Sequence, residues 1–263
     1  MLSWSLDPAE TLLLCRRLLG LSLLVSGAEH LRLARLLEAR VPWAATVGEQ
    51  GGYTILRLLG FAYARPVWTG LVAMLTLLAA GLLVTGEGAL LGPVLLIAWL
   101  GCVRFGGTFN GGSDMMTFVV GLPLLLQFVF PSLGAVRDLA IGAIGTQLLL
   151  SYLLSGVGKL REPVWRDGTA LSYLVNREQY RVPASLHRLL ARPAPSRVLS
   201  YAVIVFECAA PLALLDLRLC YGYLALAFAF HLGVAVTLGL NRFVWAWLAA
   251  FPCLPGLVGL LNR

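Results

Sequence analysis

Eight long apolar runs constrain this chain more than any other feature of its sequence. A helix that crosses the hydrocarbon core of a membrane needs about 20 mainly apolar residues. The runs cover residues 11–28, 67–85, 88–103, 115–133, 139–158, 198–217, 219–240 and 243–261. Only 13% of the 263 residues are charged and 59% are hydrophobic, whereas soluble domains have about 25% and about 45–50%. The sequence therefore excludes a soluble enzyme and predicts a membrane protein.

The expected fold is all-α: a polytopic transmembrane helix bundle of about eight spans with an interfacial amphipathic segment, because lipid offers the backbone no hydrogen-bond partners. We expect residues 1–263 to form a single membrane domain. Residues 1–66 would hold the first span and the interfacial segment, which begins at His30, and residues 67–261 would form the core. The lipid bilayer is then the main partner. The net charge of +7 lies in the loops, so it does not indicate nucleic-acid binding.

The basic residues also predict an orientation. If all eight runs cross, the loops 29–66, 104–114, 159–197 and 241–242 lie on one side and hold 15 lysines and arginines. The opposite side holds Arg137, Arg218 and Arg263. The positive-inside rule places the first group in the cytoplasm. A multi-pass protein of a bacterial inner membrane fits this pattern.

Two ionisable residues interrupt the apolar runs. A charge at the bilayer centre costs about 2.5–3.5 kcal/mol on insertion scales, so each such residue requires an explanation. Glu207 precedes Pro211, which should kink its helix, and His231 lies in the middle of the next run. We expect Glu207 and His231 to face a shared cavity and to hydrogen-bond each other or a ligand. The alternative is that they only hold helices together.

A polar stripe marks the fifth run. Gln147, Ser151, Ser155 and Lys159 follow one another at intervals of four, which places them on one slowly turning helix face. Lys159 is the only lysine of the chain. Lysine can lose its proton when desolvated and arginine cannot, so Lys159 is a candidate general base. The alternatives are an interfacial charge and a packing stripe. The five cysteines have no metal-ligand spacing, and no metal site is expected.

Residues 151–174, SYLLSGVGKLREPVWRDGTALSYL, contain a helix with Gly156 that ends in Lys159, followed by Trp165 and Gly168. This segment resembles the core of the HTTM family, the membrane domain of vitamin K-dependent gamma-glutamyl carboxylase and of bacterial relatives such as sporulation-delaying protein B. FNGGSDMM (109–116) resembles the family's Asn-containing turn, and the stretch 228–252 resembles its late histidine helix. The resemblance makes residues 67–261 a carboxylase-like core.

The resemblance implies a site and a cofactor. Lys159 corresponds to the base that deprotonates vitamin K hydroquinone, and His231 to an active-site histidine, so both are candidate catalytic residues. The candidate residues for binding a vitamin K-like quinol are Asn110, Ser155, Glu207 and Trp165. In the carboxylase this lysine faces the lumen, whereas the charge count places Lys159 towards the cytoplasm.

Two classes of function remain open. The first is an enzyme that uses a quinol-type cofactor to modify a peptide. The second is a non-catalytic membrane factor for the maturation or export of a secreted peptide. The carboxylase has a functional histidine where this chain has Gly112–Ser113, so the resemblance specifies the membrane core and leaves the reaction open.

Overall fold

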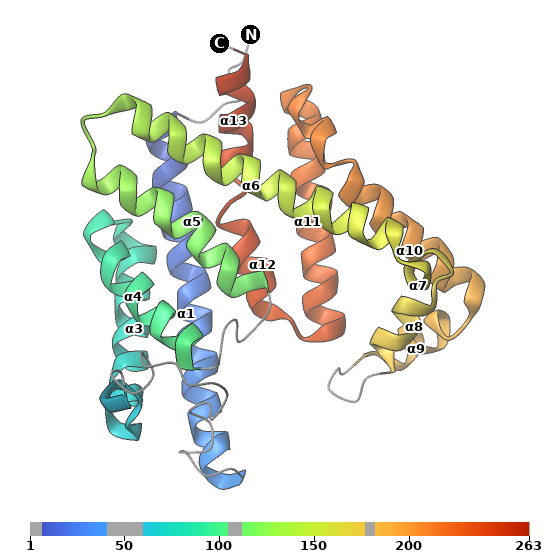
Figure 1. Cartoon of the computed structure of the whole chain (residues 1–263), viewed down its shortest axis with the longest axis horizontal. Helices are drawn as coiled ribbons and strands as arrows, with labels where there is room; N and C mark the ends of the chain where they lie inside the picture. Colours follow the sequence, from blue (N-terminus) through green and yellow to red (C-terminus); the bar gives the residue numbers. More distant parts are fainter. Residues whose placement is uncertain (1–6, 41–59, 105–111, 177–181, 263) are drawn as a thin grey trace. The chain divides into compact units, whose positions relative to one another are not determined.

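The structure of the chain is a computed structural model, and it is helical (Figure 1). It describes residues 7–40, 60–104, 112–176 and 182–262, and within these ranges it contains no strand. Seven segments there are long and apolar enough to cross a membrane: Pro8–Arg32, Arg65–Thr85, Gly112–Val129, Gly134–Arg161, Pro193–Leu214, Leu217–Leu238 and Asn241–Leu261. The predicted run at 88–103 is the shorter apolar segment Gly88–Arg104. The predicted all-α, multi-pass membrane fold is therefore confirmed.

The first helix differs from its prediction. Helix α1 (Pro8–Arg40) starts after Asp7, whose Oδ2 accepts a hydrogen bond from the amide of Ala9 at 2.9 Å. It continues without a break through residue 29, where we expected a span to give way to a separate interfacial helix. The reason lies in residues 29–40, which contain no glycine or proline and are mostly leucine, alanine, arginine and glutamate, all good helix formers. The rest of the predicted interfacial segment, 41–59, lies outside the described residues.

Prolines set two later boundaries. Helix α10 (Pro193–Cys208) starts five residues before its predicted run, because proline suits the first turn of a helix, where the amide needs no partner. The expected disturbance at Pro211 is present: α10 gives way to the 3-10 turn η4 (Ala210–Leu214). The last run is divided into α12 (Asn241–Leu248) and α13 (Cys253–Leu261), with Pro252 in the turn between them.

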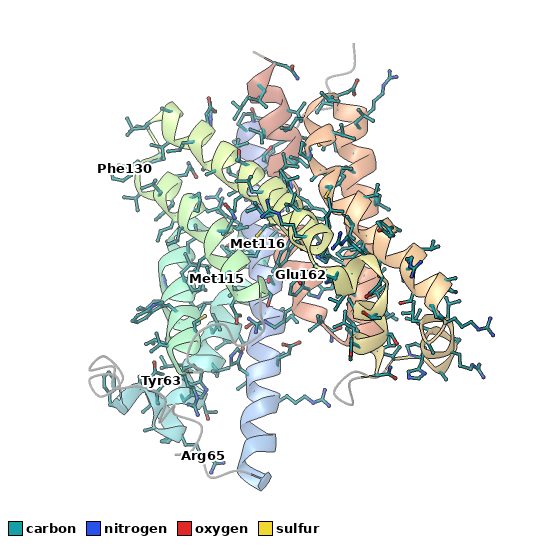
Figure 2. The ribbon with its side chains drawn as sticks, turned by 45° about the vertical axis from the view of Figure 1, so that its right-hand side comes forward. Tyr63, Arg65, Met115, Met116, Phe130 and Glu162 are labelled. Carbon is teal, nitrogen blue, oxygen red and sulfur yellow. The ribbon has the colours of Figure 1, made fainter. Side chains whose placement is uncertain are left out.

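The packing divides the chain into two units, and each is described separately. The first comprises Asp7–Ile141 and Trp245–Pro252. It contains α1, η2 (Gly60–Tyr63), α3 (Arg65–Thr85), η3 (Gly88–Leu90), α4 (Leu91–Arg104) and α5 (Gly112–Val129). Helix α1 packs against α3 and α5, and α4 packs against the same two helices. Tyr63 and Arg65, labelled in Figure 2, mark the junction of η2 and α3.

The second unit carries most of the residues singled out in the sequence. It comprises 142–244 and 253–262 of the described chain. Helix α6 (Gly134–Arg161) enters it at Gly142 and is followed by three short helices, α7 (Pro163–Arg166), α8 (Thr169–Val175) and α9 (Ala184–Leu190). These three pack against α10, and α11 (Leu217–Leu238) packs against η4 and α13. Glu162, labelled in Figure 2, lies where α6 gives way to α7. The predicted single membrane domain stays a prediction.

The orientation of the second unit can be tested at Ser185, an exposed residue of α9. Because the segment 159–197 holds eight of the basic residues, we expect a cysteine introduced by Ser185→Cys to face the cytoplasm. An impermeant maleimide should label it in opened cells and not in intact ones, above the background of the five native cysteines.

Ser132→Cys is the matched control, because Ser132 is exposed in the turn between α5 and α6, at the other end of α6. It should be labelled in intact cells. The reverse pattern for the two positions would place Lys159 outside, as in the carboxylase.

Candidate functional site

The candidate site begins at the end of α6, where Ser155 and Lys159 meet Glu207 of α10. The Nζ atom of Lys159 lies 2.8 Å from Oε1 and 2.7 Å from Oε2 of Glu207, and 2.5 Å from the Ser155 hydroxyl oxygen. The Ser155 hydroxyl donates a further bond to Oε1 of Glu207 at 3.3 Å. The Glu207 side chain is 5% exposed and that of Lys159 is 18% exposed. Lys159 and Glu207 thus form an ion pair that is largely removed from solvent, and the Ser155 hydroxyl bonds to both.

Gly156 explains why the two helices approach closely enough to form this pair. A β-carbon added at Gly156 would lie 2.8 Å from the backbone nitrogen and Sγ of Cys208, and 2.8 Å from Cβ of Glu207. Any larger residue would push α10 away from α6 at the level of the ion pair. A glycine is therefore required next to Ser155, which is itself part of the cluster.

The predicted polar stripe on α6 is only partly used. Ser155 and Lys159 belong to the ion-pair cluster. Ser151 instead donates its hydroxyl hydrogen to the carbonyl of Leu148 in its own helix, at 2.7 Å. Gln147 is exposed. The i+4 spacing is correct as geometry, and the last two positions of the stripe, Ser155 and Lys159, meet Glu207 of α10.

Trp165 of α7 lies against the lysine. The Nζ atom of Lys159 is 5.1 Å from the centre of its indole ring, within the range of a cation–π contact. Pro163 starts α7 immediately after Glu162, so a new helix begins within a few residues of Lys159. The ammonium group thus has a carboxylate, a hydroxyl and an aromatic face around it.

The turn after α7 is attached to the start of α10. Gly168 has a positive φ of 86°, and a β-carbon there would lie 2.6 Å from the backbone nitrogen of Arg197. The Ser196 hydroxyl donates to the Gly168 carbonyl at 2.5 Å. The hydroxyl and amide of Thr169 donate to Asp167 and hold the pKa of that carboxyl below its ordinary value. These contacts fix α7, and with it Trp165, relative to α10.

A second polar pair lies on the same helix. The Tyr152 hydroxyl and Nε2 of His231 on α11 are 2.6 Å apart, and the two side chains are buried, with 3% and 2% exposure. Tyr152 precedes Lys159 by seven residues, which is two helical turns, so it lies on about the same face of α6. Which atom donates in the Tyr152–His231 bond depends on the histidine tautomer.

Aromatic rings surround the tyrosine–histidine pair. Tyr223 stacks on Phe206 with ring centres 5.2 Å apart and an interplanar angle of 19°. Tyr152 meets both of these rings edge-on, while Phe230 and Phe243 contact His231. The phenol oxygen of Tyr223 is buried and has no hydrogen-bond partner among the residues that the structure describes. This apolar surrounding keeps water away from the pair.

The structure therefore rearranges the predicted pairing. Glu207 bonds Lys159 and Ser155, and His231 bonds Tyr152, so the two residues do not bond each other, which was one of the two arrangements expected. That they face a shared cavity or bond a ligand stays a prediction. Asn110 lies outside the described residues. Sequence reasoning missed Tyr152 and Tyr223. Tyr152 could have been found from its spacing of seven residues before Lys159. Tyr223 could not, because its place in the cluster depends only on how α10 and α11 pack. No group of three potential metal ligands occurs among the described residues.

The arrangement combines an ion pair at a helix end with a buried tyrosine–histidine pair. Carboxylate, amine, imidazole and phenol groups can each accept or donate a proton. All of them lie within 142–244, in the second unit. The chain matches no family model, no curated protein and no solved structure in the comparisons made.

Proposed function

We propose that residues 142–244 of this membrane protein bind a quinol-type cofactor, and that the Lys159–Glu207 pair accepts a proton during modification of a peptide. The observation that carries the proposal is the contact of the only lysine with Glu207, Ser155 and Trp165 at the end of α6. The resemblance of residues 151–174 to the HTTM core supports the choice of cofactor.

The Lys159–Glu207 pair has room for one additional proton. As an ammonium and a carboxylate, the pair carries no net charge. Uptake of a proton leaves an ammonium beside a neutral carboxylic acid, with Ser155 still bonded to the acid. If the ammonium first passes a proton to Glu207, the free amine of Lys159 becomes the acceptor and the end state is the same. The two residues therefore act as one base.

The residues around the tyrosine–histidine pair suit a quinol. When bound, a quinol supplies two electrons and two ionisable hydroxyls. The buried Tyr223 hydroxyl, which has no partner among the described residues, can bond such a hydroxyl, and the rings of Phe206 and Phe230 offer flat apolar surfaces. His231, bonded to Tyr152 through Nε2, can hold a second proton. These residues bind and orient the cofactor, while Lys159 and Glu207 hold the proton.

One observation favours the second candidate function, a non-catalytic factor for peptide maturation or export. Both carboxylate oxygens of Glu207 are bonded to Lys159, which is also what a purely structural ion pair would show. The two candidate functions differ in whether residue 159 must be an amine that can lose its proton. Arginine preserves the ion pair but cannot be deprotonated.

Lys159→Arg separates the two functions. We expect the variant to fold and to lose the ability to complement a deletion strain at equal expression, because the charge is kept and the base is removed. Arg161→Lys, at an exposed position two residues later, is the control and should complement fully.

In parallel, a short-chain naphthoquinol titrated into the protein in nanodiscs should quench tryptophan emission. Most of the saturable decrease in tryptophan emission should disappear in the Trp165→Phe variant.

A second variant, Tyr223→Phe, tests the binding of naphthoquinol. Tyr223→Phe should weaken naphthoquinol binding by about tenfold, because one hydrogen bond to a buried hydroxyl is lost. Full complementation by Lys159→Arg, together with no saturable naphthoquinol binding, would refute the enzyme and support the non-catalytic factor.

A further inference from the structure

A cavity with two charged side chains in its lining lies at the start of α11, in the second unit. Its volume is about 770 Å³, and Asp216, Leu217, Arg218 and Tyr221 line it. The turn between α7 and α8 is attached to the first turn of α10. The cavity lies at the other end of α10, where η4 leads into α11. Neither the resemblance nor the proposed function uses this cavity.

The cavity presents charges of both signs. Asp216 uses Oδ1 to cap α11, accepting a bond from the amide of Arg218 at 2.5 Å, so its second carboxylate oxygen is left for another donor. The Arg218 side chain is exposed, and it forms no ion pair with any residue that the structure describes. The phenol of Tyr221 lies one turn further along α11. A ligand with an anionic and a cationic group would satisfy both charges.

The position of the cavity indicates what kind of ligand this is. Leu215 and Asp216 separate the segment Pro193–Leu214 from the segment Leu217–Leu238, so the cavity lies at the end of two predicted membrane crossings. Large apolar side chains beside it are exposed: Leu212 by 55%, Leu215 by 70% and Leu219 by 51%. Polar headgroups and acyl chains meet at this depth of a bilayer.

We propose that this cavity binds the headgroup of a phosphatidylethanolamine molecule. The Arg218 guanidinium takes the phosphodiester through paired N–H···O bonds, and the free carboxylate oxygen of Asp216 accepts a bond from the ethanolamine ammonium. The exposed leucines contact the acyl chains. Choline has no N–H group to donate, so Asp216 distinguishes phosphatidylethanolamine from phosphatidylcholine. This inference is independent of the proposed function.

Native mass spectrometry of the purified full chain tests the site with defined lipids. Phosphatidylethanolamine should bind more tightly than phosphatidylcholine or phosphatidylglycerol. Arg218→Gln should weaken its binding by about tenfold, because a charge-assisted bond to phosphate is lost. Arg137→Gln is the matched control: Arg137 lies in the first turn of α6, at a membrane end on the predicted same side, but it is paired with Asp138 at 3.5 Å. It should bind phosphatidylethanolamine as the unaltered chain does.

A second variant tests the selectivity. Asp216→Asn retains a residue that caps helices well, so the protein should fold, yet its preference for phosphatidylethanolamine over phosphatidylcholine should disappear. Glycerophosphoethanolamine, which has no acyl chains, should fail to compete at matched concentrations. The proposal is overturned if Arg218→Gln and Arg137→Gln behave alike, if Asp216→Asn keeps the preference, or if the water-soluble headgroup competes as well as the lipid.

Discussion

Replacing Glu207 by alanine is expected to lower the free energy of unfolding by about 3 kcal/mol, because removing one partner of a largely buried ion pair leaves the other charge uncompensated. Lys159 would lose both of its bonds to the carboxylate and keep only Ser155 and the ring of Trp165. The measurement is reversible unfolding in mixed micelles, followed by circular dichroism as dodecyl sulfate replaces the neutral detergent. Glu162→Ala, at an exposed glutamate just after α6, should change the value by less than about 0.5 kcal/mol.

A double variant tests whether the loss comes from the unpaired charge. Lys159→Met with Glu207→Leu replaces the whole pair by apolar side chains of similar size. Such replacements are often neutral, so the double variant should recover most of the stability that either single change removes. An additive loss would show that the two residues stabilise the unit by separate contacts and not as a pair.

Gly156→Ala should have the second large effect. The added methyl group would meet the backbone and side chain of Cys208 and Cβ of Glu207 at 2.8 Å, and overpacking of this kind costs about 1–3 kcal/mol. Because the backbone nitrogen of Cys208 cannot turn aside as a flexible side chain can, we expect the upper part of this range. The same unfolding titration measures it.

Gly158→Ala is the matched control, since it lies two residues later in α6 and an added β-carbon there meets nothing within 4 Å. Alanine is the better helix former, so this variant should be unchanged or more stable by roughly 0.5–1 kcal/mol. Combined with Glu207→Ala, Gly156→Ala should cost less than the sum of the two single effects, because both act on the same pair. If Gly156→Ala and Gly158→Ala change the free energy of unfolding equally, α6 and α10 are not in close contact at Gly156.

Parts of the candidate site could be predicted from spacing within one helix. Ser155 and Lys159 are four residues apart and do share a face of α6, as the sequence indicated. Gln147 satisfies the same rule but is exposed. Periodicity shows which residues share a face and does not show which part of that face meets another helix. The i+4 pattern was therefore necessary for the site and not sufficient to define it.

The sequence by itself determined the class of fold. In lipid every backbone amide and carbonyl must find its partner within the protein, so apolar runs of this length become helices whatever their neighbours are. It did not determine where α10 starts: the predicted run began at residue 198, whereas the helix begins at Pro193, because proline is compatible with the first turn of a helix.

Only the tertiary structure decided the partners of the buried polar groups. Glu207 lies 48 residues after Lys159, and His231 lies 79 residues after Tyr152. From the sequence, Glu207 and His231 looked like partners because both interrupt neighbouring apolar runs. Which groups meet depends on how far each helix is rotated and how closely it approaches the next. Here the contact of Gly156 with Cys208 brings α10 against the end of α6 and directs Glu207 to Lys159. Rotation and approach are set by the packing of whole helices, which no local pattern of residues contains.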